Sequence, residues 1–97
     1  MTNTEIDRKL ALAIGYAPED ITVTRFGTYV RRGHGYYIFC HDAPDVILPI
    51  MERYEMIVNF YTKAAWMQIK RAPVIFENNP RTAAALAVIK AKEMGLI

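Results

Sequence analysis

The spacing of apolar and polar positions changes several times along the chain, and it predicts where helices and strands begin and end. Near the N-terminus, Ile6, Leu10 and neighbouring apolar residues recur at helical spacing over residues 3–14. Thr2 precedes this stretch as a capping residue, and Gly15 follows it as a stop signal. We therefore predict an amphipathic first helix. Its charged residues are expected on or beside the solvent face: Asp7, Arg8 and Lys9.

An antiparallel hairpin is predicted next, from two alternating runs. The first run covers residues 21–24 and continues through residues 29–30, and the second covers residues 36–40. The sequence Arg-Arg-Gly-His-Gly joins them at residues 31–35. Its glycines allow the positive φ that tight hairpins require, so this stretch is the expected hairpin tip.

A short helix and a second hairpin are predicted in the middle of the chain. The helix covers residues 45–54, with Asp45 as its cap and Pro49 close enough to the first turn to be tolerated. β-Branched and aromatic residues then favour two paired strands at 56–61 and 65–69.

The final helix has the most complete start signals. Asn79 suits the cap, Pro80 suits the first helical position, and an alanine-rich stretch continues to Met94. Residues 74–76 can form a short fifth strand before it. The order helix, hairpin, helix, hairpin, helix predicts a single α+β domain over residues 1–97, in which helices cover an antiparallel β-sheet as an α/β sandwich.

The composition fits one globular domain. A chain of 97 residues supports one modest core, and 53% hydrophobic residues is too many for a disordered chain. The first residues lack a basic lead and an apolar signal core, and the single cysteine cannot form an internal disulfide, so we expect a cytosolic protein. Twelve Lys and Arg against ten Asp and Glu, spread along the chain, make a dedicated nucleic-acid binder the less favoured class.

Three stretches of the sequence resemble a known group of phage proteins. They are residues 4–16, residues 44–54 and residues 79–87. Together they look like the phage ABA sandwich domain, which is similar to the NinX-like small phage proteins. Those proteins usually carry a strand around a tryptophan before the middle helix, whereas this chain has its one tryptophan, Trp66, in the later hairpin. The resemblance implies a phage or prophage accessory protein in the cytoplasm of a host bacterium, and it carries over no catalytic residues and no cofactor.

Cys40, His41 and Asp42 include the residue types of a nucleophile, a base and an orienting acid. Neighbours on a strand point to opposite faces, so three consecutive residues cannot converge as a triad. Cys40 is expected as a small buried residue and Asp42 as a turn former. His34 and His41 could join Cys40 around a metal, but no paired Cys or His spacing supports such a site. We expect no catalysis, metal or cofactor here.

The predicted hairpin tip is the main candidate for a binding site. Guanidinium groups offer a planar fork of donors, and glycine lets the backbone approach an anion closely, so a tip rich in both suits phosphate. The alternative is a solvated turn whose charges protect a sheet edge. The residues concerned are Arg25, Arg31, Arg32, Gly33, His34, Gly35 and Tyr36, with Tyr29 nearby.

Four further residues form a secondary candidate surface. Lys70, Arg71 and Arg81 would extend the basic tip if the fold brings them close. Arg81 is unfavourably placed for the dipole of the last helix, so it is either exposed or beside a negative group. Trp66 is expected in the core, although an exposed Trp66 would mark an interface.

These features favour a non-enzymatic binding protein. One hypothesis is a protein that binds a host factor directly and antagonises it, such as a factor of host defence. The alternative is a sponge that sequesters a small phosphorylated nucleotide through the basic tip. A hydrolase built around Cys40 or His41 has the least support. Because so short a chain has more apolar surface than one core hides, we also expect a homo-oligomer, most simply a C2 dimer.

Overall fold

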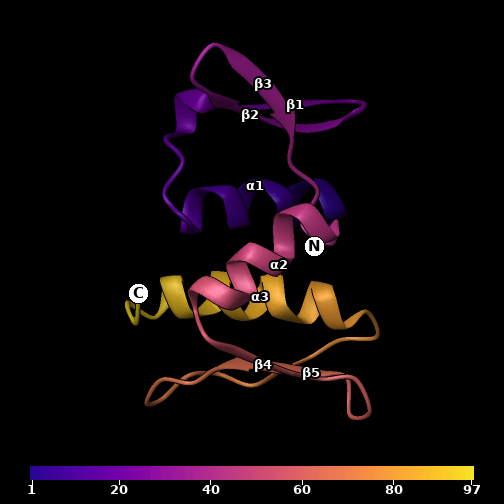
Figure 1. Ribbon diagram of the computed structural model, residues 1–97, viewed down its shortest axis with the longest axis vertical. Helices are drawn as coiled ribbons and strands as arrows, with labels where there is room; N and C mark the ends of the chain where they lie inside the picture. The colour runs from indigo at the N-terminus through magenta and orange to yellow at the C-terminus, as the bar shows by residue number, and fades with distance from the viewer.

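Three α-helices lie between two three-stranded antiparallel sheets. The computed structural model describes all of residues 1–97. Figure 1 shows one sheet at each end of the longest axis and the helices between them, in a molecule measuring 37 × 25 × 22 Å. In chain order the elements are α1 (Asn3–Ala13), a 3₁₀ turn (Pro18–Asp20), β1 (Ile21–Thr24), β2 (Gly27–Arg32), β3 (Gly35–Ile38), α2 (Pro44–Arg53), β4 (Met56–Asn59), β5 (Ala64–Met67), β6 (Ile75–Phe76) and α3 (Pro80–Glu93). We call β1–β2–β3 sheet A and β4–β5–β6 sheet B.

Helix α1 begins and ends where its sequence predicts. Thr2 Oγ1 accepts the backbone N–H of Glu5 at 3.2 Å, which satisfies one of the free donors of the first turn. Gly15 follows the helix with a φ of 116°, a value that L side chains rarely adopt. One expectation was wrong: Asp7 is only 6% exposed and does not face solvent.

Sheet A is a three-strand meander. The β2–β3 hairpin turns at Gly33 and His34, which confirms the predicted tip. The alternating run before it is not one continuous strand, because a second tight turn separates β1 from β2. In that turn Thr24 Oγ1 accepts the N–H of Phe26 at 3.1 Å. Within β2, Thr28 and Val30 are buried, so the intervening residues face away from the helices.

Sheet B contains the second predicted hairpin. β4 and β5 pair from Met56 opposite Met67 to Asn59 opposite Ala64, and the short β6 pairs with β5 on its other side. Ala65, on the face of β5 toward the helices, leaves room for a helix to approach this sheet closely. Helix α3 fills that space with alanines that are fully buried or nearly so: Ala83, Ala84, Ala85, Ala87 and Ala91.

The starts of α2 and α3 differ in how they are capped. At α3 the Asn79 side chain accepts the N–H of Arg81 at 3.0 Å and Pro80 takes the first helical position, as predicted. At α2 the cap is not Asp45 but Ala43, which makes no side-chain hydrogen bond; Asp45 lies in the first turn. Pro49 lies inside α2, where its missing N–H removes one helical hydrogen bond without ending the helix.

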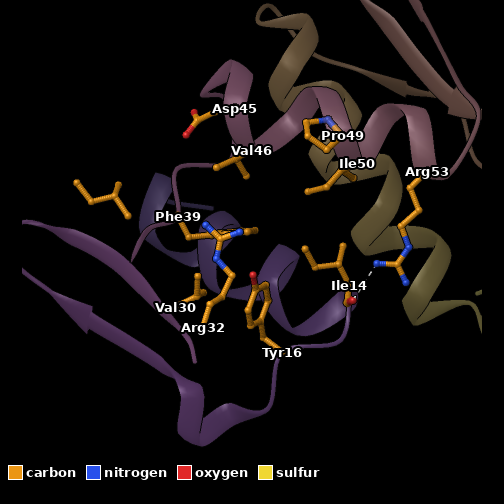
Figure 2. A pocket seen from close by; sticks show the side chains of 11 residues that line it. Ile14, Tyr16, Val30, Arg32, Phe39, Asp45, Val46, Pro49, Ile50 and Arg53 are labelled. Carbon is orange, nitrogen blue, oxygen red and sulfur yellow. Dashed lines mark hydrogen bonds between the residues drawn. The ribbon is translucent and has the colours of Figure 1, made fainter. Parts of the chain in front are cut away.

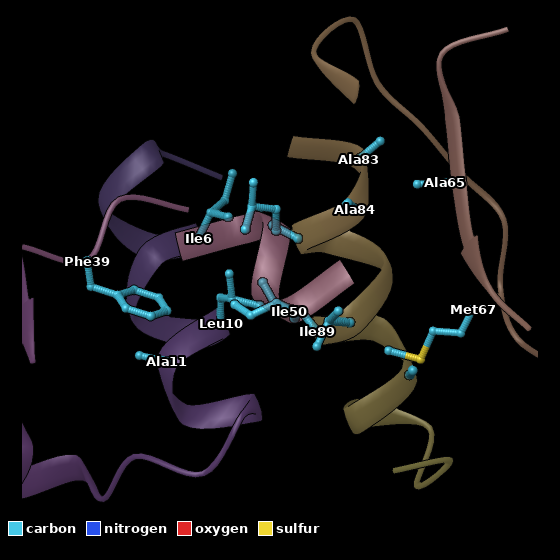
Figure 3. Packing of buried hydrophobic residues seen from close by; sticks show 14 of the residues in the cluster. Ile6, Leu10, Ala11, Phe39, Ile50, Ala65, Met67, Ala83, Ala84 and Ile89 are labelled. Atoms are coloured by element: carbon cyan, nitrogen blue, oxygen red, sulfur yellow. The ribbon is translucent and has the colours of Figure 1, made fainter. Parts of the chain in front are cut away.

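The core lies in the helical layer. Figure 3 shows Ile6 and Leu10 from α1 packing with Ile50 from α2 and Ile89 from α3, while Met67 reaches in from sheet B. The α+β class, with helices packed on antiparallel sheet, is confirmed. The hydrophobic pattern did not indicate that the two hairpins build separate sheets. None of the helices combines the length and the apolar character needed to cross a membrane.

Candidate functional site

The tip of the β2–β3 hairpin divides its two arginines between the two faces of sheet A. Arg31 lies on the outer face, and its Nε donates to the Gly33 carbonyl at 3.4 Å. Arg32 lies on the inner face, with its guanidinium carbon 4.3 Å from the centroid of the Tyr37 ring. His34 is an exposed turn residue. The two guanidinium groups of the tip therefore lie on opposite faces of sheet A and do not converge on one anion.

The other predicted basic residues lie away from Arg31 and Arg32. Arg25 occupies the β1–β2 turn at the opposite end of β2, where it stacks 4.8 Å from the Phe26 ring. Lys70 and Arg71 follow β5, on the far side of the helical layer (Figure 1). Arg81 has a polar neighbour, because its Nη1 donates to the Asp42 carbonyl at 3.2 Å. The structure thus brings none of these residues together with Arg31 and Arg32.

A cavity of about 250 Å³ lies between sheet A, α2 and the end of α1 (Figure 2). Aromatic rings form part of its wall: Tyr16 and Phe39 meet edge to face, with centroids 5.9 Å apart. Figure 2 shows Arg32 reaching into this space from β2, while Arg53 extends from the end of α2 at its edge, beside Ile14. Asp45 lies at the start of α2 on the same cavity. We call this the Arg32–Arg53 cavity.

The charged groups of the Arg32–Arg53 cavity have no ion-pair partners. The ion pairs of the protein join His41 to Asp7 and Lys90 to Glu93, and none involves this cavity. Arg53 donates from Nη1 to the Ile14 carbonyl at 3.3 Å, which leaves its other donors unused. Two guanidinium groups and one carboxylate are therefore available to a ligand.

The outer face of sheet B is apolar and no helix covers it, although Trp66 is half-buried there. Register places Ile57 opposite Trp66, and Phe76 lies on the same side of the sheet, away from the residues that pack on α3. Phe60 and Tyr61 adjoin it in the β4–β5 turn. Phe76 is 67% exposed and Tyr61 is 95% exposed. We call Ile57, Phe60, Tyr61, Trp66 and Phe76 the aromatic face.

Cys40, His41 and Asp42 do not form a nucleophile–base–acid chain. They lie after β3, where Cys40 Sγ donates to Asp42 Oδ1 at 2.9 Å. The His41 ring is buried and uses its two nitrogens elsewhere: Nδ1 is 2.6 Å from Asp7 Oδ1, and Nε2 is 3.0 Å from Thr82 Oγ1. No cluster of three or more His, Cys, Asp or Glu side chains is arranged to hold a metal ion.

The hydrogen bond between Cys40 and Asp42 shifts the pKa of both groups. It lowers the pKa of Asp42 below its usual value, and the nearby charges of His41 and Arg81 act in the same direction. It raises the pKa of the Cys40 thiol, to which partial burial also contributes. A thiol with a raised pKa keeps its proton at neutral pH and is a weak nucleophile.

The hydrogen-bonded chain Asp7–His41–Thr82 was not predicted from the sequence. Its groups follow the order of a hydrolase triad, with Thr82 in the nucleophile position. Its contacts also join three separate segments: α1, the turn before α2, and α3. The available signal was the helical spacing of Asp7 with Leu10 and Ala11, which places Asp7 on the buried stripe of α1.

Comparison of the chain with models of known families, with curated proteins and with solved structures found no match in any of the three. The resemblance to small phage proteins therefore depends on the sequence motifs alone.

Proposed function

We propose that this protein is a non-enzymatic binding protein that acts by direct contact with another protein, and that the aromatic face is its contact surface. The observation that carries the proposal is the position of the helices. All three lie on the inner side of sheet B, so no element of the chain covers Phe76 or Tyr61. Exposed contiguous aromatic surface of this kind is typical of interaction sites, where Trp, Tyr and Phe supply most of the binding energy.

The charged residues around the aromatic face favour a partner with an acidic rim. Lys63 lies in the β4–β5 turn beside Tyr61, and Lys70 and Arg71 follow the other end of β5. The acidic residues of this sheet are fewer: Glu77 directly after β6 and Glu55 directly before β4. Complementary charge at the rim of an interface speeds association and fixes the orientation of the partner. The proposed partner therefore presents an apolar centre with acidic residues around it.

The resemblance to the phage ABA sandwich domain and the NinX-like proteins is the ground for placing this partner in a bacterial host. On that ground we propose a host protein as the target, with antagonism of a host-defence factor as the consequence of binding. The contact surface itself is argued from the exposed residues of sheet B and does not depend on the resemblance.

The proposal can be tested by site-specific photocrosslinking in bacterial lysate. A photoreactive phenylalanine derivative replaces Tyr61 in one sample and Phe26 in a control. Phe26 is a matched position, because it is 77% exposed in a turn of sheet A, at the other end of the molecule. We expect a discrete crosslinked protein from position 61 and none from position 26. Equal labelling from both positions, or none from position 61, would contradict the proposal.

A further inference from the structure

We propose that the Arg32–Arg53 cavity binds a nucleoside monophosphate, with the phosphate held by the two guanidinium groups and the base edge by Asp45. This site lies on sheet A, on the other side of the helical layer from the aromatic face (Figure 1). It is therefore a second binding activity, independent of the protein contact proposed above.

The anionic part of the ligand follows from the arginines. Arg32 and Arg53 both line the cavity, and neither has a carboxylate partner. Guanidinium groups bind phosphate through paired, charge-assisted hydrogen bonds, which are stronger than neutral ones. The cavity lining carries two positive side chains against one negative, Asp45, so an anion is favoured overall.

The length of the ligand follows from Asp45 and Arg53. They are eight positions apart on α2, which corresponds to about 12 Å along the helix axis at about 1.5 Å per residue. A free amino acid with an uncharged side chain carries both its charges at one end and cannot reach the two groups together. A nucleoside monophosphate presents N–H donors of its base at one end and a phosphate at the other, and carboxylates accept hydrogen bonds from base N–H groups.

The middle of the cavity suits a flat ring. Tyr16 is half-buried and offers aromatic surface, while Phe39, Val30 and Ile50 are nearly fully buried and form the apolar floor of the cavity (Figure 2).

The volume of the cavity limits the size of the ligand. At about 250 Å³ it is below the range of roughly 300 Å³ and more that encloses drug-sized molecules. It accommodates one base, with the sugar and phosphate toward the mouth. Of the hairpin-tip residues that the sequence suggested for a nucleotide site, only Arg32 lines this cavity. The other charged residues of the cavity, Asp45 and Arg53, lie on α2.

The test is a titration of the purified protein with AMP, GMP, CMP and UMP, and separately with inorganic phosphate, followed by NMR and by thermal melting. We expect at least one nucleotide to bind saturably and to shift the ring signals of Tyr16 and Phe39. Inorganic phosphate should bind more weakly than that nucleotide, because it lacks the base. No saturable binding by any of the four, or equal affinity for phosphate alone, would overturn the proposal.

Variants locate the site. Arg32→Ala should weaken nucleotide binding about tenfold to a hundredfold, the range expected for losing charge-assisted hydrogen bonds. Arg31→Ala is the matched control, since it removes the same charge from the next residue on the outer face and should leave the affinity unchanged. Arg53→Lys keeps the charge of a residue that also contacts Ile14, and it should weaken binding in a protein that remains folded. Equal losses in Arg31→Ala and Arg32→Ala would show general charge attraction instead of this site.

Discussion

Asp7 Oδ1 accepts two hydrogen bonds from His41, one from the backbone N–H at 2.8 Å and one from the ring Nδ1 at 2.6 Å. The two residues are 34 positions apart, and both side chains are buried. Through Thr82, the same imidazole also contacts α3. This arrangement satisfies a buried carboxylate and holds together the helical layer that supports both sheets.

Removing the carboxylate should therefore destabilise the fold. Asp7→Ala leaves the His41 backbone N–H and ring without their shared partner, and we expect a loss of about 3 kcal/mol or more in the free energy of unfolding. Thr82→Val removes one hydrogen bond at the edge of the chain and should cost about 1 kcal/mol. Urea unfolding followed by circular dichroism measures both values. Similar losses in the two variants would contradict the structural role of the Asp7–His41 pair.

The triad-like order of these groups leads to a separate prediction. We expect a fluorophosphonate probe, which labels activated hydroxyl nucleophiles, to leave Thr82 unmodified, because the His41 ring that would act as its base is 1% exposed and is held between Asp7 and Thr82. Mass spectrometry of the digested protein provides the measurement, with a known serine hydrolase as the positive control. Labelling of Thr82 that disappears in Asp7→Asn would show that the chain is catalytic.

Local signals in the sequence predicted much of the secondary structure. Helix starts and stops depend on residues within one turn of the chain, so they can be predicted without knowing the tertiary structure. Examples are the cap at Thr2, Gly15 with its positive φ, and the Asn79–Pro80 pair. The β1–β2 turn was missed because Arg25 and Phe26 carry no glycine or proline signal, and only Gly27 marks it.

The candidate sites depended on long-range packing and were predicted less completely. The sequence grouped Arg32 with the hairpin tip, whereas in the structure Arg32 lines a cavity together with Arg53, which comes from another element. Arg25 was grouped with the tip, although the strand between them separates the two ends of sheet A. Periodicity assigns a residue to a face of its own element, and it cannot say which other element that face meets.

The shifted pKa values predict how Cys40 affects stability with pH. A lowered pKa in the folded state means that Asp42 contributes stability above its ordinary value of 3.8, and this contribution is lost as pH falls toward the folded value. A raised pKa means that the Cys40 contribution is present below its ordinary value of 9.0 and is lost as pH rises past it. The difference in melting temperature between wild type and Cys40→Ala should thus be largest near neutral pH. A difference that does not change from acid to alkaline pH would contradict this.

Thr28 gives a prediction of increased stability. Its side chain is 1% exposed, and its hydroxyl makes no hydrogen bond. Thr28→Val removes this unsatisfied group with little change of shape, so we expect a gain of about 1 kcal/mol in the free energy of unfolding. Thr22→Val, on the exposed side of the neighbouring strand, is the control and should change stability by less than about 0.5 kcal/mol. A loss of stability in Thr28→Val would mean that the hydroxyl has a partner.

The homo-oligomer expected from the sequence remains a prediction, and the outer face of sheet A is the surface we assign to it. Register places Tyr36 and Ile38 on that face, where they are 62% and 65% exposed, and Ile38 also borders the Arg32–Arg53 cavity at the sheet edge. Light scattering at micromolar concentration should give twice the chain mass of 11.1 kDa, and Tyr36→Ser with Ile38→Ser should return the single-chain mass. A wild-type protein that scatters as a single chain would exclude the dimer.

The central claim is that the aromatic face of sheet B binds another protein, and an affinity measurement tests it most directly. The protein captured by crosslinking at position 61 is purified and titrated with wild type, with the pair Tyr61→Ser and Phe76→Ser, and with Phe26→Ser. Both variant proteins lose exposed aromatic rings and should keep the wild-type melting temperature. We expect the pair to weaken binding by about 2 kcal/mol or more, as for residues that dominate an interface, and Phe26→Ser to bind like wild type. Unchanged affinity in the Tyr61 and Phe76 pair would contradict the claim.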